Sequence, residues 1–131
     1  MKQREAVKAY LAVKDLNKQK MSSGRTAKKI FDLYCILQKY WEFQGQEEIK
    51  VNQRYPNLDF EKGSVNMEGM SPEERAKTLE TVASVNRELN QIGETEIDLV
   101  PEKFVIEFDE EPNLKISGED IGALEKFIEF K

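Results

Sequence analysis

Few side chains in this sequence could carry out covalent chemistry. Its 131 residues include no His, so no imidazole is present to activate a Ser or Cys nucleophile or to complete a usual zinc site. The single Cys, Cys35, is expected to be a small buried apolar group rather than a reactive thiol. The glycines never gather into the strand-loop-helix context of a phosphate-binding loop. We therefore predict no catalytic residue, no cofactor and no metal.

A run of carboxylates, Asp109-Glu110-Glu111, is the remaining candidate for chemistry. Hard cations such as calcium take oxygen ligands from clusters of this kind, but the spacing matches no known calcium loop. The alternative is a solvated turn whose charges keep a hairpin from pairing with other chains, and we favour it. Carboxylates acting as general acid and base need a defined separation that a sequence does not show.

Basic residues near the start of the chain form the better candidate for binding. Five of them are predicted to form an interaction surface: Lys8, Lys14, Lys18, Arg25 and Lys28. Such a cluster could meet phosphates, although no recognition-helix or sheet-aromatic signature accompanies it. A solvated face, partly neutralised by acidic residues elsewhere, is the favoured alternative.

Charge is divided unevenly along the chain. Residues 1–55 contain twelve Lys or Arg against six Asp or Glu, and residues 56–131 contain eight against nineteen, which gives the net charge of -5. The two halves could attract each other within one fold, which we favour, or each could face a separate partner.

Composition indicates a folded domain rather than a disordered or membrane-spanning chain. Charged residues make up 34% and hydrophobic residues 39%. No apolar run approaches the roughly 18 residues of a membrane span, and the start lacks a signal peptide's apolar segment. We expect one domain, 1–131, located in the cytoplasm.

Apolar periodicity predicts a helical hairpin over residues 2–54. The stretch Arg25 to Phe43 reads as one long helix, apolar on most sides, that continues toward Asn52 past Gly45. It holds the only Trp, so Trp41 is predicted to be the centre of the core. An earlier helix, Lys2 to Lys20, should pack antiparallel to it through the loop at Gly24.

The rest of the chain predicts an α+β fold that is mainly helical. Residues 55–70 read as an extended connector, and Ser71-Pro72-Glu73-Glu74 is a capping box that should open a third helix over 71–92. Residues 103–131 predict a small β-hairpin, from Lys103–Phe108 and Leu114–Ile116, and a terminal helix after Ser117.

The order of these features resembles a family of short uncharacterised phage and prophage proteins, a domain of unknown function of tailed phages of Gram-positive bacteria. The matching residues are Lys20–Thr26 at the front, and Phe104–Ile106, Ser117–Glu119 and Phe127–Phe130 at the end. The resemblance implies a phage accessory product concerned with virion structure or assembly, and it carries no catalytic residue.

These observations predict a protein that acts by contact. The expected function is a non-enzymatic structural or assembly protein, in the host cytoplasm or associated with the virion, whose partner is another protein or a second copy of itself. The alternative is a nucleic-acid-associated regulator that uses the basic N-terminal helices.

Overall fold

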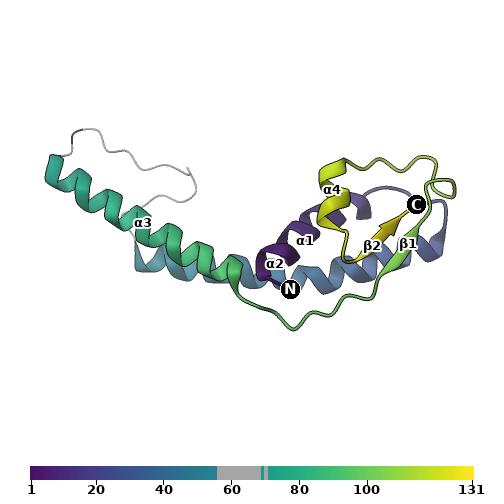
Figure 1. Ribbon diagram of the computed structural model, residues 1–131, viewed down its shortest axis with the longest axis horizontal. Helices are drawn as coiled ribbons and strands as arrows, with labels where there is room; N and C mark the ends of the chain where they lie inside the picture. The colour runs from purple at the N-terminus through teal and green to yellow at the C-terminus, as the bar shows by residue number, and fades with distance from the viewer. Residues whose placement is uncertain (56–68, 70) are drawn as a thin grey trace.

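The mainly helical α+β fold is confirmed, and the helical hairpin that the sequence predicts is present. The computed structural model describes residues 1–55, 69 and 71–131, and in it helices α1 (Gln3–Asn17) and α2 (Gly24–Arg54) pack antiparallel (Figure 1). The Ser23 hydroxyl caps α2 by accepting a hydrogen bond from the Thr26 N–H at 3.4 Å. Helix α1 ends before the predicted Lys20. The N–H groups of Lys18 and Gln19 donate to the carbonyls of Asp15 and Leu16, three residues back instead of four, as at the tightened last turn of a helix.

The main core lies between α1, the first half of α2 and the C-terminal segment. Alanines on the buried face of α1 let the two helices approach closely, and each large apolar side chain buried there contributes about 1.5–3 kcal/mol. Gln3 is also buried, and its Nε2 donates to the Tyr40 carbonyl at 2.7 Å. The buried apolar residues are Ala6, Ala9, Tyr10, Ala12, Val13, Leu16, Ile30, Leu33, Leu37, Ile106, Leu124, Phe127 and Ile128.

Helix α3 (Pro72–Glu94) packs on the second half of α2, and these two segments together are called the arm. Figure 1 shows the arm extending away from the rest of the molecule. Its core is thin: Val51 and Val85 are buried, with partly buried apolar neighbours around them. The predicted capping box is confirmed, since Ser71 Oγ accepts from the Glu74 N–H at 3.2 Å and Glu74 Oε2 accepts from the Ser71 N–H at 3.3 Å.

The predicted β-hairpin is wrong. Strand β1 (Phe104–Ile106) lies where a strand is expected, but it pairs in parallel with β2 (Ile128–Phe130), in the register Phe104 to Ile128. Residues 114–116 form no strand. Parallel strands need a crossover between them, and helix α4 (Gly118–Ala123) lies within it.

The terminal helix is therefore shorter than predicted. The Ser117 hydroxyl caps α4 as expected, accepting from the Asp120 N–H at 3.1 Å. After Ala123 the chain turns, and Ile128, Glu129 and Phe130 are buried, exposed and half-buried in turn. This alternation has the period of a strand, and aromatic and β-branched residues favour that state.

The extended connector predicted over residues 55–70 cannot be compared with the structure in full. Tyr55 is half-buried at the end of α2 and packs against the core of the arm. Residues 56–68 and 70 lie outside the described residues.

Candidate functional site

The five predicted basic residues lie on the first two helices or directly beside them. Lys8, Lys14 and Lys18 are on the side of α1 opposite its buried residues, and Arg25 and Lys28 are in the first turns of α2. Lys14, Lys18 and Arg25 are at the same end of the helix pair, whereas Lys8 is about 15 Å before Lys18 along α1. Within the described part of the chain, none of the five forms an ion pair.

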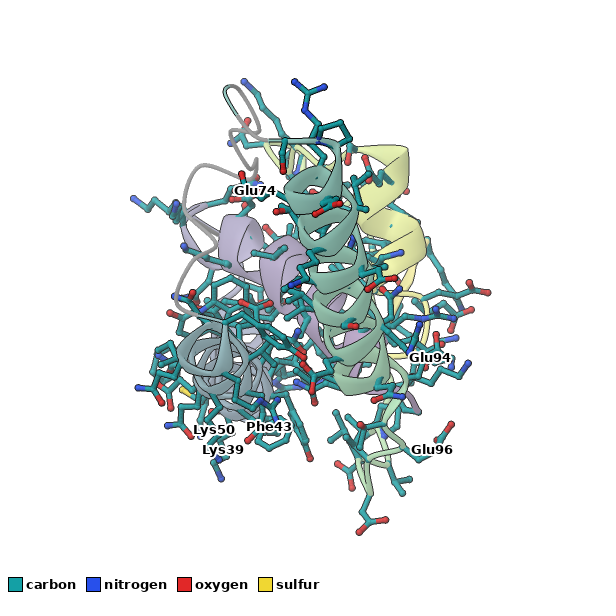
Figure 2. The ribbon with its side chains drawn as sticks, turned by 90° about the vertical axis from the view of Figure 1, so that its left-hand side faces the viewer. Lys39, Phe43, Lys50, Glu74, Glu94 and Glu96 are labelled. Atoms are coloured by element: carbon teal, nitrogen blue, oxygen red, sulfur yellow. The ribbon has the colours of Figure 1, made fainter. Side chains whose placement is uncertain are left out.

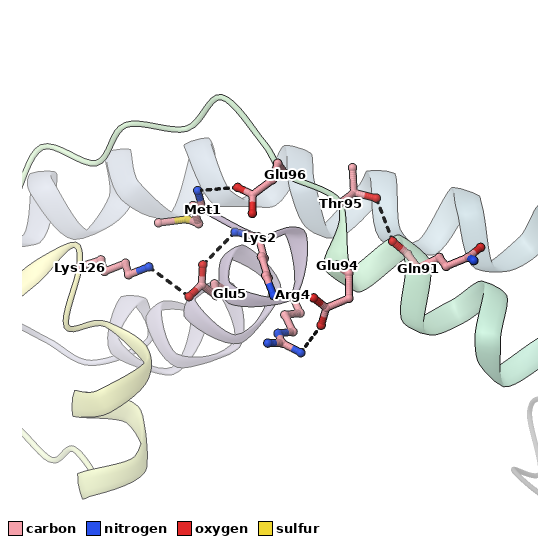
Figure 3. Close-up of polar contacts among 9 residues, drawn as sticks. All are labelled: Met1, Lys2, Arg4, Glu5, Gln91, Glu94, Thr95, Glu96 and Lys126. Carbon is pink, nitrogen blue, oxygen red and sulfur yellow. Dashed lines mark hydrogen bonds and ion pairs between the residues drawn. The ribbon is translucent and has the colours of Figure 1, made fainter.

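Other charged residues form ion pairs that join the two halves of the chain. Glu94 at the end of α3 receives the Lys2 ammonium at 2.5 Å and also the Arg4 guanidinium (Figure 3). The hydrogen bond from Lys2, with Arg4 nearby, lowers the pKa of Glu94. Lys126 pairs with Glu5 at 3.1 Å, and Arg54 pairs with Glu88 at 3.4 Å. Electrostatic attraction between the two halves therefore helps to hold α1 against α3 and the segment after α4.

The carboxylate run at residues 109–111 is not uniformly solvated. Asp109 and Glu110 are exposed, but Glu111 is buried. Its two oxygens accept the backbone N–H groups of Ser22, at 2.7 Å, and Ser23, at 3.1 Å. Glu111 thus fixes the loop between α1 and α2. No group of three or more metal-ligating side chains occurs in the described ranges.

Two predictions about α2 are wrong. Trp41 is 41% exposed rather than central, and Cys35 is exposed rather than buried. Helix α2 has 31 residues, and the described elements around it cover only one side of it. Its buried residues in the main core, Ile30, Leu33 and Leu37, share that covered side.

The uncovered side of α2 carries large apolar side chains. Figure 2 shows Lys39, Phe43 and Lys50 projecting from α2 away from α3. Half-exposed apolar residues are common one at a time, but five on one helix form a candidate contact surface. They are Phe31, Ile36, Trp41, Phe43 and Ile49, and their exposed fractions run from 41% to 59%. Trp41 lies at the edge of this surface, because its ring also stacks on Tyr10 of α1.

A shallow groove lies beside Ile36. It has a volume of about 490 Å³ and runs between α2 and the segment that leads into β1. Leu33, Leu99 and Phe104 contribute apolar surface to it, while Lys29 and Glu102 are charged residues in its lining. The Lys29 ammonium also lies 5.8 Å from the centre of the Phe104 ring. Phe43 follows Ile36 by seven residues, so both lie on this side of α2.

Comparison with known proteins finds no matching family model, no matching curated protein and no matching solved structure. Among the described residues, no helix is long and apolar enough to span a membrane.

The sequence predicts the basic residues as a binding surface but does not show which apolar residues of α2 are exposed. The signal was present, because apolar residues nearly surround the axis of the predicted helix. A helix that is apolar on all sides is either buried or covered by a partner.

Proposed function

We propose that this chain is a non-enzymatic phage accessory protein, structural or concerned with assembly, that acts through protein-protein contacts. The phage assignment depends on the sequence resemblance alone. The contact function is supported by one structural observation: the uncovered side of α2 exposes Phe31, Ile36, Trp41, Phe43 and Ile49. Aromatic residues are enriched in protein interfaces, and Trp is among the residue types that most often supply a large share of the binding energy.

The groove side of α2 is the surface that we assign to the virion or assembly partner. Ile36 and Phe43 lie along it, 46% and 41% exposed, and the adjoining groove is lined by both apolar and charged residues. A partner side chain that fills the groove would be desolvated on several sides, which is typical of interface anchors.

Co-purification from phage-infected or prophage-induced cells tests the proposal. A tagged wild-type chain should retain a virion or assembly protein, and Ile36→Asp with Phe43→Asp should lose it. A matched control is Leu79→Asp, which places the same charge at an exposed apolar position on α3. The proposal would be rejected if the wild type retained no such protein and the purified chain turned over a substrate.

A second candidate, a nucleic-acid-associated regulator, is favoured by the unpaired state of Lys8, Lys14, Lys18, Arg25 and Lys28 among the described residues. Cations without intramolecular partners can neutralise phosphates, and such binding weakens steeply with salt. Titration with duplex DNA and RNA at two salt concentrations tests it. Binding that is absent at low salt, or unchanged when the five residues are replaced by Gln, would remove this candidate.

A further inference from the structure

One row of residues follows the side of α2 that the other described elements leave uncovered. Phe31, Cys35, Gln38, Glu42, Gly45 and Ile49 follow one another in steps of four and three, so they form a single stripe along the helix, and each is exposed or half-exposed. Phe31 and Ile49, at its two ends, are 52% and 59% exposed and are the most exposed large apolar side chains on α2. This set of six residues is called the α2 stripe.

Steps of four and three in alternation make the α2 stripe symmetric about position 40, and the paired positions carry matching residue types: two large apolar, two small and two polar residues. Phe31 and Ile49 lie nine residues to either side of Tyr40, Cys35 and Gly45 lie five, and Gln38 and Glu42 lie two. When two such helices run antiparallel, each residue faces its counterpart on the other copy. We propose that the α2 stripe binds the same stripe of a second copy of this chain, with the two α2 helices antiparallel and the two-fold axis at position 40.

In this arrangement the apolar ends cover each other. Phe31 of each copy packs on Ile49 of the other, which removes both pairs from water. The stripe from Phe31 to Ile49 spans 18 steps along the chain, about 27 Å of helix. Because the interface is isologous, every contact is made twice.

Within one copy, no contact of the described residues explains why position 45 is a glycine. A glycine inside a helix costs about 1 kcal/mol relative to Ala. Among the described residues, a Cβ added at Gly45 would meet nothing within 4 Å, so no contact described within one copy requires a glycine there. Opposite Cys35 of a second copy, the missing side chain lets the two helix backbones approach closely.

Charge favours the antiparallel orientation. In the first half of α2 the cations Arg25, Lys28, Lys29 and Lys39 outnumber the one acid, Asp32, and none of these residues has an ion pair within the described residues. In the second half, Lys50 and Arg54 are neutralised by Glu47 and Glu88, which leaves Glu42 and Glu48 without a cationic partner in the same part of the chain. Antiparallel packing sets the basic half of each helix against the acidic half of the other.

At the centre of the stripe, the facing residues of the two copies also carry complementary polar groups. Glu42 faces Gln38 of the second copy, whose amide can donate to the carboxylate, and the next residue of that copy is Lys39. A parallel pair would instead place Glu42 against Glu42 and Lys39 against Lys39.

This inference rests on the proposed function in one respect, because both assign contact to the uncovered side of α2. They use different faces of it, however, and fail separately. A monomeric purified chain would reject the dimer and leave the groove side free for a virion partner.

Light scattering on the purified chain tests the dimer. The wild type should have twice the mass of one 15.2 kDa chain. Phe31→Asp with Ile49→Asp should have the mass of one chain and an unchanged helical circular dichroism spectrum. The matched control, Leu79→Asp with Val100→Asp, alters two exposed apolar positions elsewhere and should remain a dimer. A monomeric wild type, or a stripe variant that stays dimeric, would overturn the inference.

Disulfide trapping tests the register. In Gly45→Cys, oxidised glutathione should link the introduced thiol of each copy to Cys35 of the other, because the two positions face each other. Within one helix these positions are about 15 Å apart, too far for an internal bond. Gly45→Cys with Cys35→Ser should stay unlinked, as should the wild type, whose two Cys35 residues lie about 15 Å apart along the axis. A Cys35 to Cys35 bond in the wild type, or no link in Gly45→Cys, would overturn the antiparallel register.

Discussion

The indole ring of Trp41 stacks on the ring of Tyr10, with 5.2 Å between the ring centroids and 19° between the ring planes. Tyr34 stacks on Tyr10 as well, at 5.4 Å. Tyr10 on α1 is buried, whereas Trp41 on α2 is 41% exposed. The pair therefore joins the two helices at the edge of the core, with Tyr10 inside and Trp41 as its outer cover.

Replacing Trp41 with Ala should lower the free energy of unfolding by about 1–2 kcal/mol. The loss comprises the ring stack and the buried part of the indole, and is smaller than the about 3–5 kcal/mol of a fully buried aromatic residue. Urea unfolding followed by circular dichroism measures it. Phe43→Ala is the control, since Phe43 is equally exposed and has no ring partner among the described residues. A loss above about 3 kcal/mol for Trp41→Ala would contradict this placement.

Stability should fall at high pH because of Tyr10. The hydrogen bond to the Tyr34 hydroxyl, 3.5 Å between oxygens, and burial raise the pKa of Tyr10 to about 12. The unfolded value is about 10, so this stabilisation is complete below pH 10 and is lost as the pH rises toward 12. Unfolding free energies at about pH 9 and pH 11 measure the effect. Tyr10→Phe should reduce the difference between these two free energies; an equal difference in the wild type and in Tyr10→Phe would refute the assignment.

The helices could be predicted from the sequence because their signals are local. Ser23 and Ser71 stand directly before α2 and α3, and apolar periodicity continues through each helix. Strand pairing is not local. Phe104 pairs with Ile128, 24 residues later, while residues 114–116 alternate in the same way and lie closer. The sequence of β1 alone does not show whether it pairs with residues 114–116 or with β2, which lies beyond α4.

The exposed side of α2 and the buried carboxylate could not be predicted from the sequence for a related reason. The residue types around Trp41 indicate a buried helix, but which side is covered depends on how many elements pack on it. In the sequence, nothing distinguishes Glu111 from Asp109 and Glu110, because all three are carboxylates in one run. Only the tertiary fold places Glu111 beside the N–H groups of Ser22 and Ser23.

Glu111→Ala should lower the free energy of unfolding by about 2–3 kcal/mol. Two backbone N–H groups lose a charged acceptor, and hydrogen bonds to charged groups are worth about 1.5–3 kcal/mol. Glu110→Ala changes the exposed neighbouring carboxylate and should shift stability by less than about 0.5 kcal/mol. Thermal unfolding of the two variants at neutral pH makes the comparison. Equal effects would show that Glu111 does not fix the loop.

The ion pairs at Glu94 should give a small pH dependence in the acid range. Lys2 and Arg4 hold the pKa of this carboxyl below its ordinary value of 4.5, so its stabilisation is present above that value and is lost as the pH falls through the folded pKa. Glu94→Gln should remove this contribution, and about 0.5 M salt should weaken it. Carbon NMR titration of the Glu94 carboxyl follows it directly. Glu102→Gln is the control, because Glu102 is exposed and has no ion pair within the described ranges. A Glu94 midpoint at or above 4.5 would contradict the pairing.

Ser71→Ala should destabilise the arm by about 1 kcal/mol, because the hydroxyl no longer accepts the Glu74 N–H at the start of α3. The arm has only Val51 and Val85 fully buried among its described residues, so the loss should appear first as local opening of α3 rather than as global unfolding. Hydrogen exchange of amides in the first two turns of α3 reports that opening. Ser71→Asp keeps an acceptor at the cap and adds favourable charge at the helix N-terminus, so its exchange should match the wild type. Unchanged exchange in Ser71→Ala would mean that the capping box does not hold the end of the arm.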